Sequence, residues 1–234
     1  MRRGTAPRRG APDTRDPLPP KTLRPLSDAE LPRDDLVEEA ALACLSFVDL
    51  DLSGRDVVNA DIAESRLATC RFGPGRFDRV SLSDCELIGC DLANLQAQDS
   101  SMVRTSVTSC RATGLSWGGG PLKDVRWEGC RADMSAFRFA RFTRVLFTGC
   151  DLRQADFQNA DLRGVRFEDC DLSGAQFSNA VTTGTRFQRC SLGGIAGVHS
   201  LRGAVVDSYD LADLAHSLAG ALGITIEEQE AGAP

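Results

Sequence analysis

The chain is poor in the residues and segments on which catalysis and membrane insertion most often depend. Only two histidines occur among its 234 residues, His199 and His216, and neither lies near a recognisable nucleophile motif. The glycine run 118–120 lacks the Lys-Ser/Thr pair that completes a phosphate-binding loop. No apolar run approaches the ~18 residues that span a membrane, and no hydrophobic segment follows Met1-Arg2-Arg3. We therefore expect no catalytic residues, no cofactor, no metal site, no signal peptide and no association with membranes.

The chain also lacks a net positive charge. The formal net charge is −6 and the isoelectric point is about 5.0, so bulk electrostatics do not favour direct binding to nucleic acid. The nine cysteines form an odd number without a secretory signal, which favours reduced thiols in the cytoplasm over a disulfide framework.

What the sequence has instead is a repeat of five residues. From Phe47 to Leu192, every fifth residue is Leu, Ile, Val, Met, Phe or Trp at 26 of 30 positions, the exceptions being Ala97, Ala112, Ala132 and Thr182. Two residues before each of these centre positions, a small or β-branched residue stands at 25 of 30 positions. This spacing is neither the 3.6-residue period of a helix nor the two-residue alternation of a strand. It suits a chain that turns a corner every five residues, so that four sides make one 20-residue coil.

The cysteines support the 20-residue coil independently. Seven of them recur at every fourth repeat and occupy the small inward position: Cys70, Cys90, Cys110, Cys130, Cys150, Cys170 and Cys190. They should form one straight ladder on one side of the tube, at the ~4.8 Å spacing of neighbouring strands. Metal binding is the functional alternative, but no cysteine pair has the clustered spacing of a zinc site. We interpret the ladder as filling of the core.

Large aromatic residues should stack in the same way at the centre positions. The strongest candidates for this centre stack are Phe137, Phe157, Phe177, Phe147, Phe167 and Phe187. The stretch 96–121 is the weak point of the pattern, because Ala97 and Ala112 underfill the centre. We expect a local irregularity there, with a functional notch as the alternative.

The motif at the start of each repeat resembles the pentapeptide-repeat family. It is seen as Ala155-Asp156-Phe157, Ala160-Asp161-Leu162, Cys150-Asp151-Leu152 and Cys170-Asp171-Leu172, and the resemblance covers residues 36–195. It implies an all-β solenoid, a right-handed quadrilateral β-helix, here of about eight coils. The tail from Leu201 onward resembles actinobacterial-type members that carry a C-terminal helix. The best-known members of the family resemble B-form DNA in shape and charge, bind type II topoisomerases such as DNA gyrase and protect them from inhibitors.

Three regions follow from these patterns. Residues 1–33 are rich in proline and arginine and are expected to be disordered. Residues 34–200 should form the β-helix. Residues 201–234 should contain a helix and a tail, with the apolar face of the helix formed by Leu211, Leu214, Leu218 and Leu222. This helix either caps the last coil, which would otherwise leave an open edge, or also forms a homodimer.

Two binding functions remain open. A DNA mimic that binds gyrase needs a strongly negative surface, but residues 45–200 contain 19 Asp or Glu and 18 Lys or Arg. Positions that should stack on one another also carry opposite charges, such as Asp51 with Arg71 and Arg71 with Asp91. We therefore favour a scaffold that binds a protein partner of unidentified nature, with the gyrase-binding DNA mimic as the alternative.

Overall fold

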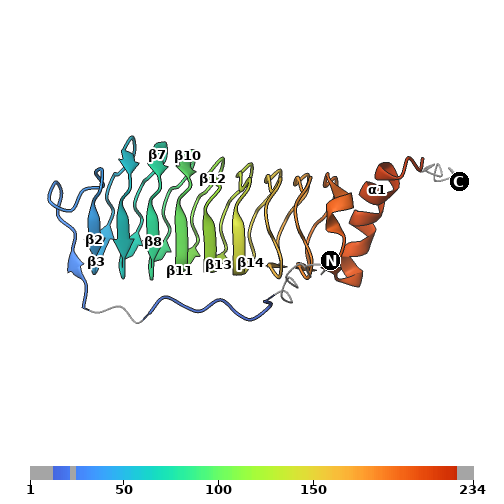
Figure 1. Ribbon diagram of the computed structural model, residues 1–234, viewed down its shortest axis with the longest axis horizontal. Coiled ribbons are helices and arrows are strands. Elements are labelled where there is room, and N and C mark those ends of the chain that lie inside the picture. Colours follow the sequence, from blue (N-terminus) through green and yellow to red (C-terminus); the bar gives the residue numbers. More distant parts are fainter. Residues whose placement is uncertain (1–12, 22–24, 226–234) are drawn as a thin grey trace, which may run out of the picture.

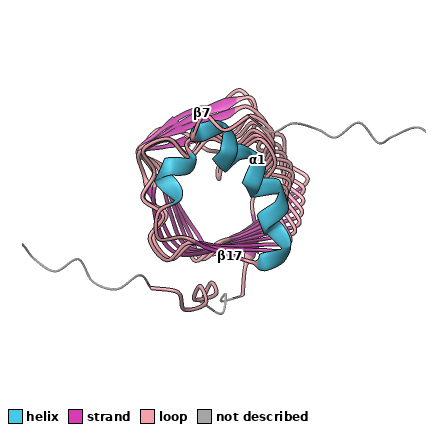
Figure 2. Cartoon of the chain, turned by 90° about the vertical axis from the view of Figure 1, so that its right-hand side faces the viewer, coloured by secondary structure: helices cyan, strands magenta, loops and turns pink. Residues whose placement is uncertain are grey.

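The computed structural model describes residues 13–21 and 25–225. The chain winds into an elongated parallel β-solenoid of about nine turns, with one helix, α1, at its C-terminal end (Figure 1). Viewed along its axis, the solenoid is roughly four-sided (Figure 2). The sequence predicted about eight coils, and partial turns at the two ends account for the difference.

Two neighbouring sides of the solenoid share one 13-stranded parallel sheet. We call them side 1 and side 2 in the order in which the chain runs through them. Side 1 begins with β2 (Ala41–Ala43), β5 (Asp61–Ala63) and β8 (Ser81–Ser83). Side 2 contains β1 (Ser27–Asp28), β3 (Leu45–Val48), β6 (Arg66–Ala68), β9 (Glu86–Ile88), β15 (Arg166–Glu168), β16 (Arg186–Gln188) and β17 (Val205–Val206). Three longer strands continue around the corner from side 1 to side 2: β11 (Ser101–Thr108), β13 (Pro121–Glu128) and β14 (Arg141–Thr148).

The other two sides are less regular. Side 3 is held by single parallel bridges that connect equivalent positions of successive coils, from Asp51 with Arg71 to Asp171 with Ser191. Side 4 carries a four-stranded parallel sheet in its N-terminal half, made of β4 (Asp56–Val58), β7 (Gly75–Asp78), β10 (Leu95–Gln98) and β12 (Ser116–Gly118). The register of one full coil that the sequence predicted is present on all four sides, for example in the pairing of Phe147 with Phe167.

The corners explain why a five-residue repeat closes into a coil. The residue two positions after each centre adopts a positive φ at nearly every corner, as in Asn59 (φ 57°), Asn159 (φ 59°) and Gly174 (φ 73°). This left-handed conformation turns the chain from one side to the next, and it is adopted most readily by Gly, Asn and Asp. Phe139, the one phenylalanine outside the five-residue frame, occupies such a corner (φ 61°) with 61% of its surface exposed.

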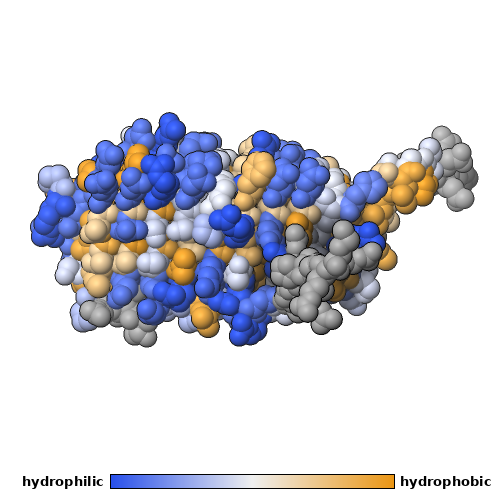
Figure 3. Space-filling model, viewed as in Figure 1, coloured by the Kyte–Doolittle hydropathy of each residue, from blue (hydrophilic) through white to orange (hydrophobic). Residues whose placement is uncertain are grey.

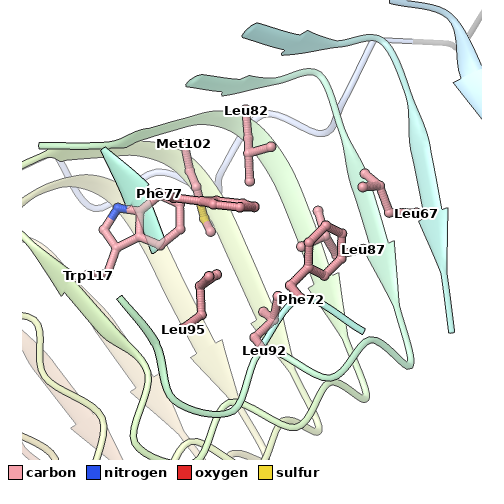
Figure 4. Close-up of a pocket in the computed structure, with 9 residues that line it drawn as sticks. All are labelled: Leu67, Phe72, Phe77, Leu82, Leu87, Leu92, Leu95, Met102 and Trp117. Atoms are coloured by element: carbon pink, nitrogen blue, oxygen red, sulfur yellow. The ribbon is translucent and has the colours of Figure 1, made fainter. Parts of the chain in front are cut away.

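The core is a continuous column of centre and small residues along the axis. Backbone hydrogen bonds join each coil to the next, so the coils stabilise one another in sequence. A small apolar cavity of about 10 Å³ lies in the N-terminal half of the core, with Phe77, Leu95 and Trp117 among the residues that line it. Leu95 and Trp117 both point toward this cavity (Figure 4).

The C-terminal end closes with short helices. The 3₁₀ helices η1 (Val198–Leu201) and η2 (Ser208–Asp210) precede α1 (Leu211–Ala221), which lies across the end of the solenoid (Figure 2). Leu214 is the buried residue of α1, whereas Leu211, Leu218 and Leu222 are 54%, 37% and 69% exposed. Hydrophobic residues accordingly gather at this end of the molecule (Figure 3).

The N-terminal region differs from the expected disorder where the structure describes it. Residues 13–21 run along the outside of the solenoid, opposite to the order of the coils (Figure 1), and Ser27–Asp28 pair with Leu45–Ser46. The physical reason is that side chains of the solenoid bind this segment, as described below. The expectation of disorder for residues 1–12 and 22–24 lies outside the described residues. The division of the chain near residues 33 and 200 stays a prediction.

Candidate interaction surface

The cysteine ladder lies inside the solenoid, with all seven residues buried and free. Their thiols donate to backbone carbonyl groups, for example Cys130 Sγ to Val107 O at 3.3 Å. Burial raises the pKa of the neighbouring Cys85 thiol to about 11. The ladder thiols are buried and bonded to backbone carbonyl groups, so they contribute packing and hydrogen bonds to the core.

The predicted centre stack also lies in the core. Phe137 stacks on Phe157 with ring centroids 5.4 Å apart, and Phe157 stacks on Phe177 at the same distance. On side 2, Phe147, Phe167 and Phe187 stack at 5.1 and 5.2 Å. Both columns are fully enclosed, so neither offers a surface to a ligand.

The outer surface carries ordered pairs of arginine and carboxylate side chains. On side 3, Arg71 lies 3.3 Å from Asp51 and Arg111 lies 3.1 Å from Asp91, each across one coil. Other arginines pair within their own coil, as Arg153 does with Asp151 at 2.6 Å. The charges that the sequence arranges in columns are thus largely neutralised locally. Exposed pairs of this kind contribute little stability, about 0.2–1 kcal/mol each, but they determine which charges a partner meets.

The most enclosed charges lie on the corner between sides 1 and 2. Four residues, each one coil after the last, alternate in sign there: Asp84, Arg104, Asp124 and Arg144. We call them the Asp/Arg corner. Arg104 donates to both oxygens of Asp84, and Arg144 to both oxygens of Asp124, all at 2.5 Å. The carboxylates are buried, with 5% and 2% of their side-chain surfaces exposed.

The electrostatics of this corner favour ionised carboxylates. The hydrogen bonds from Arg104 lower the pKa of Asp84. For Asp124, burial is the largest single influence and acts to raise the pKa, but the hydrogen bonds from Arg144 and Leu18 and the nearby positive charges together outweigh it, so the pKa lies below its usual value. Both carboxylates therefore remain charged at neutral pH, and each can accept a further hydrogen bond.

The N-terminal segment provides those further bonds. The backbone N–H of Leu18 donates to Asp124 Oδ1, and that of Lys21 donates to Asp84 Oδ1, both at 3.0 Å. Asp13 forms an ion pair with Arg144 at 3.0 Å, and Asp16 forms one with Arg166. Between this segment and side 2 lies a groove of about 450 Å³, bordered by Pro17, Leu18, Pro19, Glu86, Ser106 and Arg126.

Sequence reasoning missed this contact although two signals were present. The alternation of acid and base once per coil, from Asp84 to Arg144, could have been found by sorting residues by corner. The segment from Pro17 to Lys21 is also rich in proline, which favours an extended backbone over disorder.

Other kinds of site receive no support from the described parts of the chain. Across residues 13–21 and 25–225, no group of three or more His, Cys, Asp or Glu side chains could hold a metal ion. Within the same residues, no helix is long and apolar enough to cross a membrane.

Comparison with known proteins agrees with this geometry. Residues 121–196 match the profile of the family described as "Pentapeptide repeat region". The five-residue frame and the one-coil register continue without interruption beyond this match, back to Leu45 on side 2.

Residues 121–196 are a pentapeptide-repeat region. Among solved structures the chain is similar to trypsin-treated QnrB1 (M102R), described as a plasmid-mediated fluoroquinolone resistance protein, with 20% identity, 86% of this chain and 96% of that chain covered, and a TM-score of 0.38. It is also similar to HetL from the cyanobacterium Nostoc sp. strain PCC 7120, a pentapeptide-repeat protein involved in regulating heterocyst differentiation, with 16% identity, 72% and 85% coverage, and a TM-score of 0.32. No curated protein sequence matches the chain. What these descriptions say of QnrB1 and HetL applies to those proteins.

Proposed function

We propose that this protein is a non-catalytic scaffold that binds a protein partner in the cytoplasm. The observation that carries the proposal is the local pairing of opposite charges along the sides of the solenoid. A rigid surface of mixed polarity with exposed arginines is typical of protein–protein interfaces. On side 3, the Arg71, Arg111 and Arg131 side chains are 59%, 56% and 63% exposed, so they are accessible to a partner.

Rigidity supports the same function. The coils are joined by backbone hydrogen bonds near 2.9 Å along side 3, such as Asp91 N to Cys70 O and Arg111 N to Cys90 O. A partner that binds across several coils therefore meets a preorganised surface, which reduces the entropy lost on binding.

The gyrase-binding DNA mimic is the alternative that this charge pattern opposes. A DNA mimic has to present unpaired negative charge to a basic DNA-binding groove. Here Asp84, Asp91 and Asp124 each lie against an arginine of the next coil, which cancels their charge at the surface. The similarity to QnrB1 is a similarity of fold.

A supercoiling assay separates the two functions. Purified gyrase is incubated with increasing amounts of the full chain, with and without a fluoroquinolone. The scaffold proposal expects neither inhibition of supercoiling nor rescue from the drug at micromolar protein. Concentration-dependent inhibition or rescue would instead favour the DNA mimic.

A capture experiment tests the scaffold directly with matched surface variants. The immobilised full chain is compared with Arg71→Ala/Arg111→Ala on side 3 and with Arg76→Ala/Arg138→Ala on side 4. We expect a partner protein whose retention falls by about tenfold, or 1.4 kcal/mol, in one double variant and not in the other. Retention of no protein above a blank surface, or equal retention by all three chains, would contradict the proposal.

A further inference from the structure

The hydrogen bonds between residues 13–21 and the Asp/Arg corner are regularly spaced. The two backbone donors, Leu18 and Lys21, are three residues apart, and the acceptors, Asp124 and Asp84, are two coils apart. Three residues of polyproline II backbone advance about 9.3 Å. Two coils advance about 9.6 Å at the usual strand spacing. An extended proline-rich chain therefore matches every second coil of the solenoid almost without adjustment.

The two residues between the donors, Pro19 and Pro20, also suit this spacing. Pro19 and Pro20 have no backbone N–H, so the segment offers hydrogen only where a carboxylate accepts it. Leu18 precedes a proline, which restricts it to extended conformations. The Leu18 side chain is 53% exposed, so the contact depends on the backbone and not on burial of this side chain.

Ion pairs at the N-terminal end of the segment determine the direction in which it runs along the corner. Asp13 and Asp16 lie N-terminal to the two donors, and they pair with Arg144 and Arg166. At Gly164, the position one coil beyond Arg144, an added Cβ would lie 2.7 Å from the carbonyl oxygen of Asp13. A glycine at this corner (φ 74°) thus leaves room for the backbone of the segment.

The carboxylates themselves are built to accept these bonds. Each is held by a guanidinium group on one side, and its remaining lone pairs face the segment. A carboxylate oxygen can accept more than one hydrogen bond, and Oδ1 of each residue accepts from the segment in addition to its arginine, so the corner favours a ligand with N–H groups at this spacing.

We propose that the Asp/Arg corner, extended by Arg166, is a peptide-binding site for extended, proline-containing segments that carry two backbone N–H groups three residues apart and carboxylates on their N-terminal side. Residues 13–21 occupy this site within the same chain. The site adds to the proposed scaffold function and does not depend on it, because its contacts lie wholly within this chain. A partner segment of the same chemistry has to displace residues 13–21 to bind.

Peptide binding to the full chain tests the site. The variant Leu18→Pro/Lys21→Pro removes both N–H donors of the internal segment while it preserves an extended backbone. The probe is a fluorescent peptide of residues 12–22, and the control is the same peptide with both positions changed to proline.

Because a tethered segment acts at an effective concentration of about 1 mM, we expect the probe to bind the variant at least ~10-fold more tightly than the wild-type chain. The control peptide should bind the variant at least ~10-fold more weakly than the probe does. Equal binding of the two peptides, or no binding of the probe to the variant at about 1 mM, would overturn the proposal.

Hydrogen exchange tests the occupied state in the wild-type chain. We expect the amides of Leu18 and Lys21 to exchange at least ~10-fold more slowly than that of Thr14. Two charge-balanced variants serve as mutual controls: Asp124→Ala/Arg144→Ala should release the Leu18 amide, and Asp84→Ala/Arg104→Ala should release the Lys21 amide. Circular dichroism verifies that both variants are folded. Unprotected amides in the wild-type chain, or protection that neither folded variant changes, would contradict the assignment.

Discussion

The indole N–H of Trp117 donates to the backbone carbonyl oxygen of Ser100 at 3.1 Å. In neighbouring coils the equivalent carbonyl accepts from the backbone of the next coil, as Val80 O does from Ser101 N and Gly120 O from Arg141 N. At this coil the donor position is occupied by Pro121, which has no N–H. The indole of Trp117 thus supplies the missing ladder bond.

Because Trp117 donates this bond and Trp127 does not, replacing the two tryptophans should affect stability differently. The buried Trp127 Nε1 has no hydrogen-bond partner among the described residues. Trp117→Phe should lower the free energy of unfolding by about 1–3 kcal/mol more than Trp127→Phe, because only the former leaves a buried carbonyl group unpaired. Both changes remove a similar volume from the core, so each serves as the control for the other. Urea denaturation measures the difference, and equal losses in the two variants would contradict this role for Trp117.

The thiols should divide into one accessible group and eight protected ones. Cys44 is half-buried, and the other eight cysteines are buried, with no disulfide among the nine. A thiol reagent such as Ellman's reagent should therefore modify one thiol per native chain rapidly, and the rest only as the solenoid opens. In denaturant without reductant all nine should react. A count of seven or fewer in denaturant would indicate a disulfide.

How far the sequence predicted this structure depends on which residues follow the period. Phe147, Phe167 and Cys130 follow it, so their burial and stacking could be predicted before any coordinates. The same frame placed Asp51 beside Arg71. It did not reveal that Arg131 pairs with Asp133 of its own coil at 3.0 Å, while Asp151 of the next coil pairs with Arg153.

The period could reveal the Asp/Arg corner but not which backbone groups bind it. Leu18 binds Asp124 through its backbone, and a backbone N–H leaves no mark in the sequence except the absence of proline. At the C-terminal end, Phe187 pairs with Val206, a spacing slightly shorter than a full coil, so the last turn departs from the frame.

Asp210 continues the cysteine ladder with a different side chain. It lies one coil after Cys190, is 6% exposed, and its Oδ2 accepts from the backbone N–H of Cys190 at 2.9 Å. In the ladder itself, Cys110 Sγ accepts from Cys90 N–H at 3.3 Å. Asp210→Ala should therefore destabilise the chain by about 1–3 kcal/mol, because it leaves a buried N–H without an acceptor.

Asp210→Cys is the matched control, since it restores a sulfur acceptor of the kind found at Cys110. It should recover part of the stability that Asp210→Ala loses in guanidinium denaturation. A loss below about 0.5 kcal/mol for Asp210→Ala, the range of an ordinary surface substitution, would show that Asp210 does not hold the last coil.

Acid should weaken the solenoid through the Asp/Arg corner. In the folded chain the pKa of Asp84 is lowered by its hydrogen bonds to Arg104. The pKa of Asp124 is lowered because its hydrogen bonds and the positive charge of Arg144 together outweigh the effect of burial. A carboxyl group with a lower pKa in the folded chain stabilises the fold fully above its unfolded pKa and loses that contribution as the pH falls through the folded value. These two groups should thus leave stability unchanged from about pH 7 to pH 5 and reduce it progressively below the ordinary value of 3.8.

Urea denaturation at a series of pH values measures the loss, with Asp124→Ala/Arg144→Ala as the control. That variant should lose less stability on acidification, because one of the two titrating groups is gone. An identical acid dependence in the two chains would show that the charge of Asp124 does not contribute to the pH dependence of the fold.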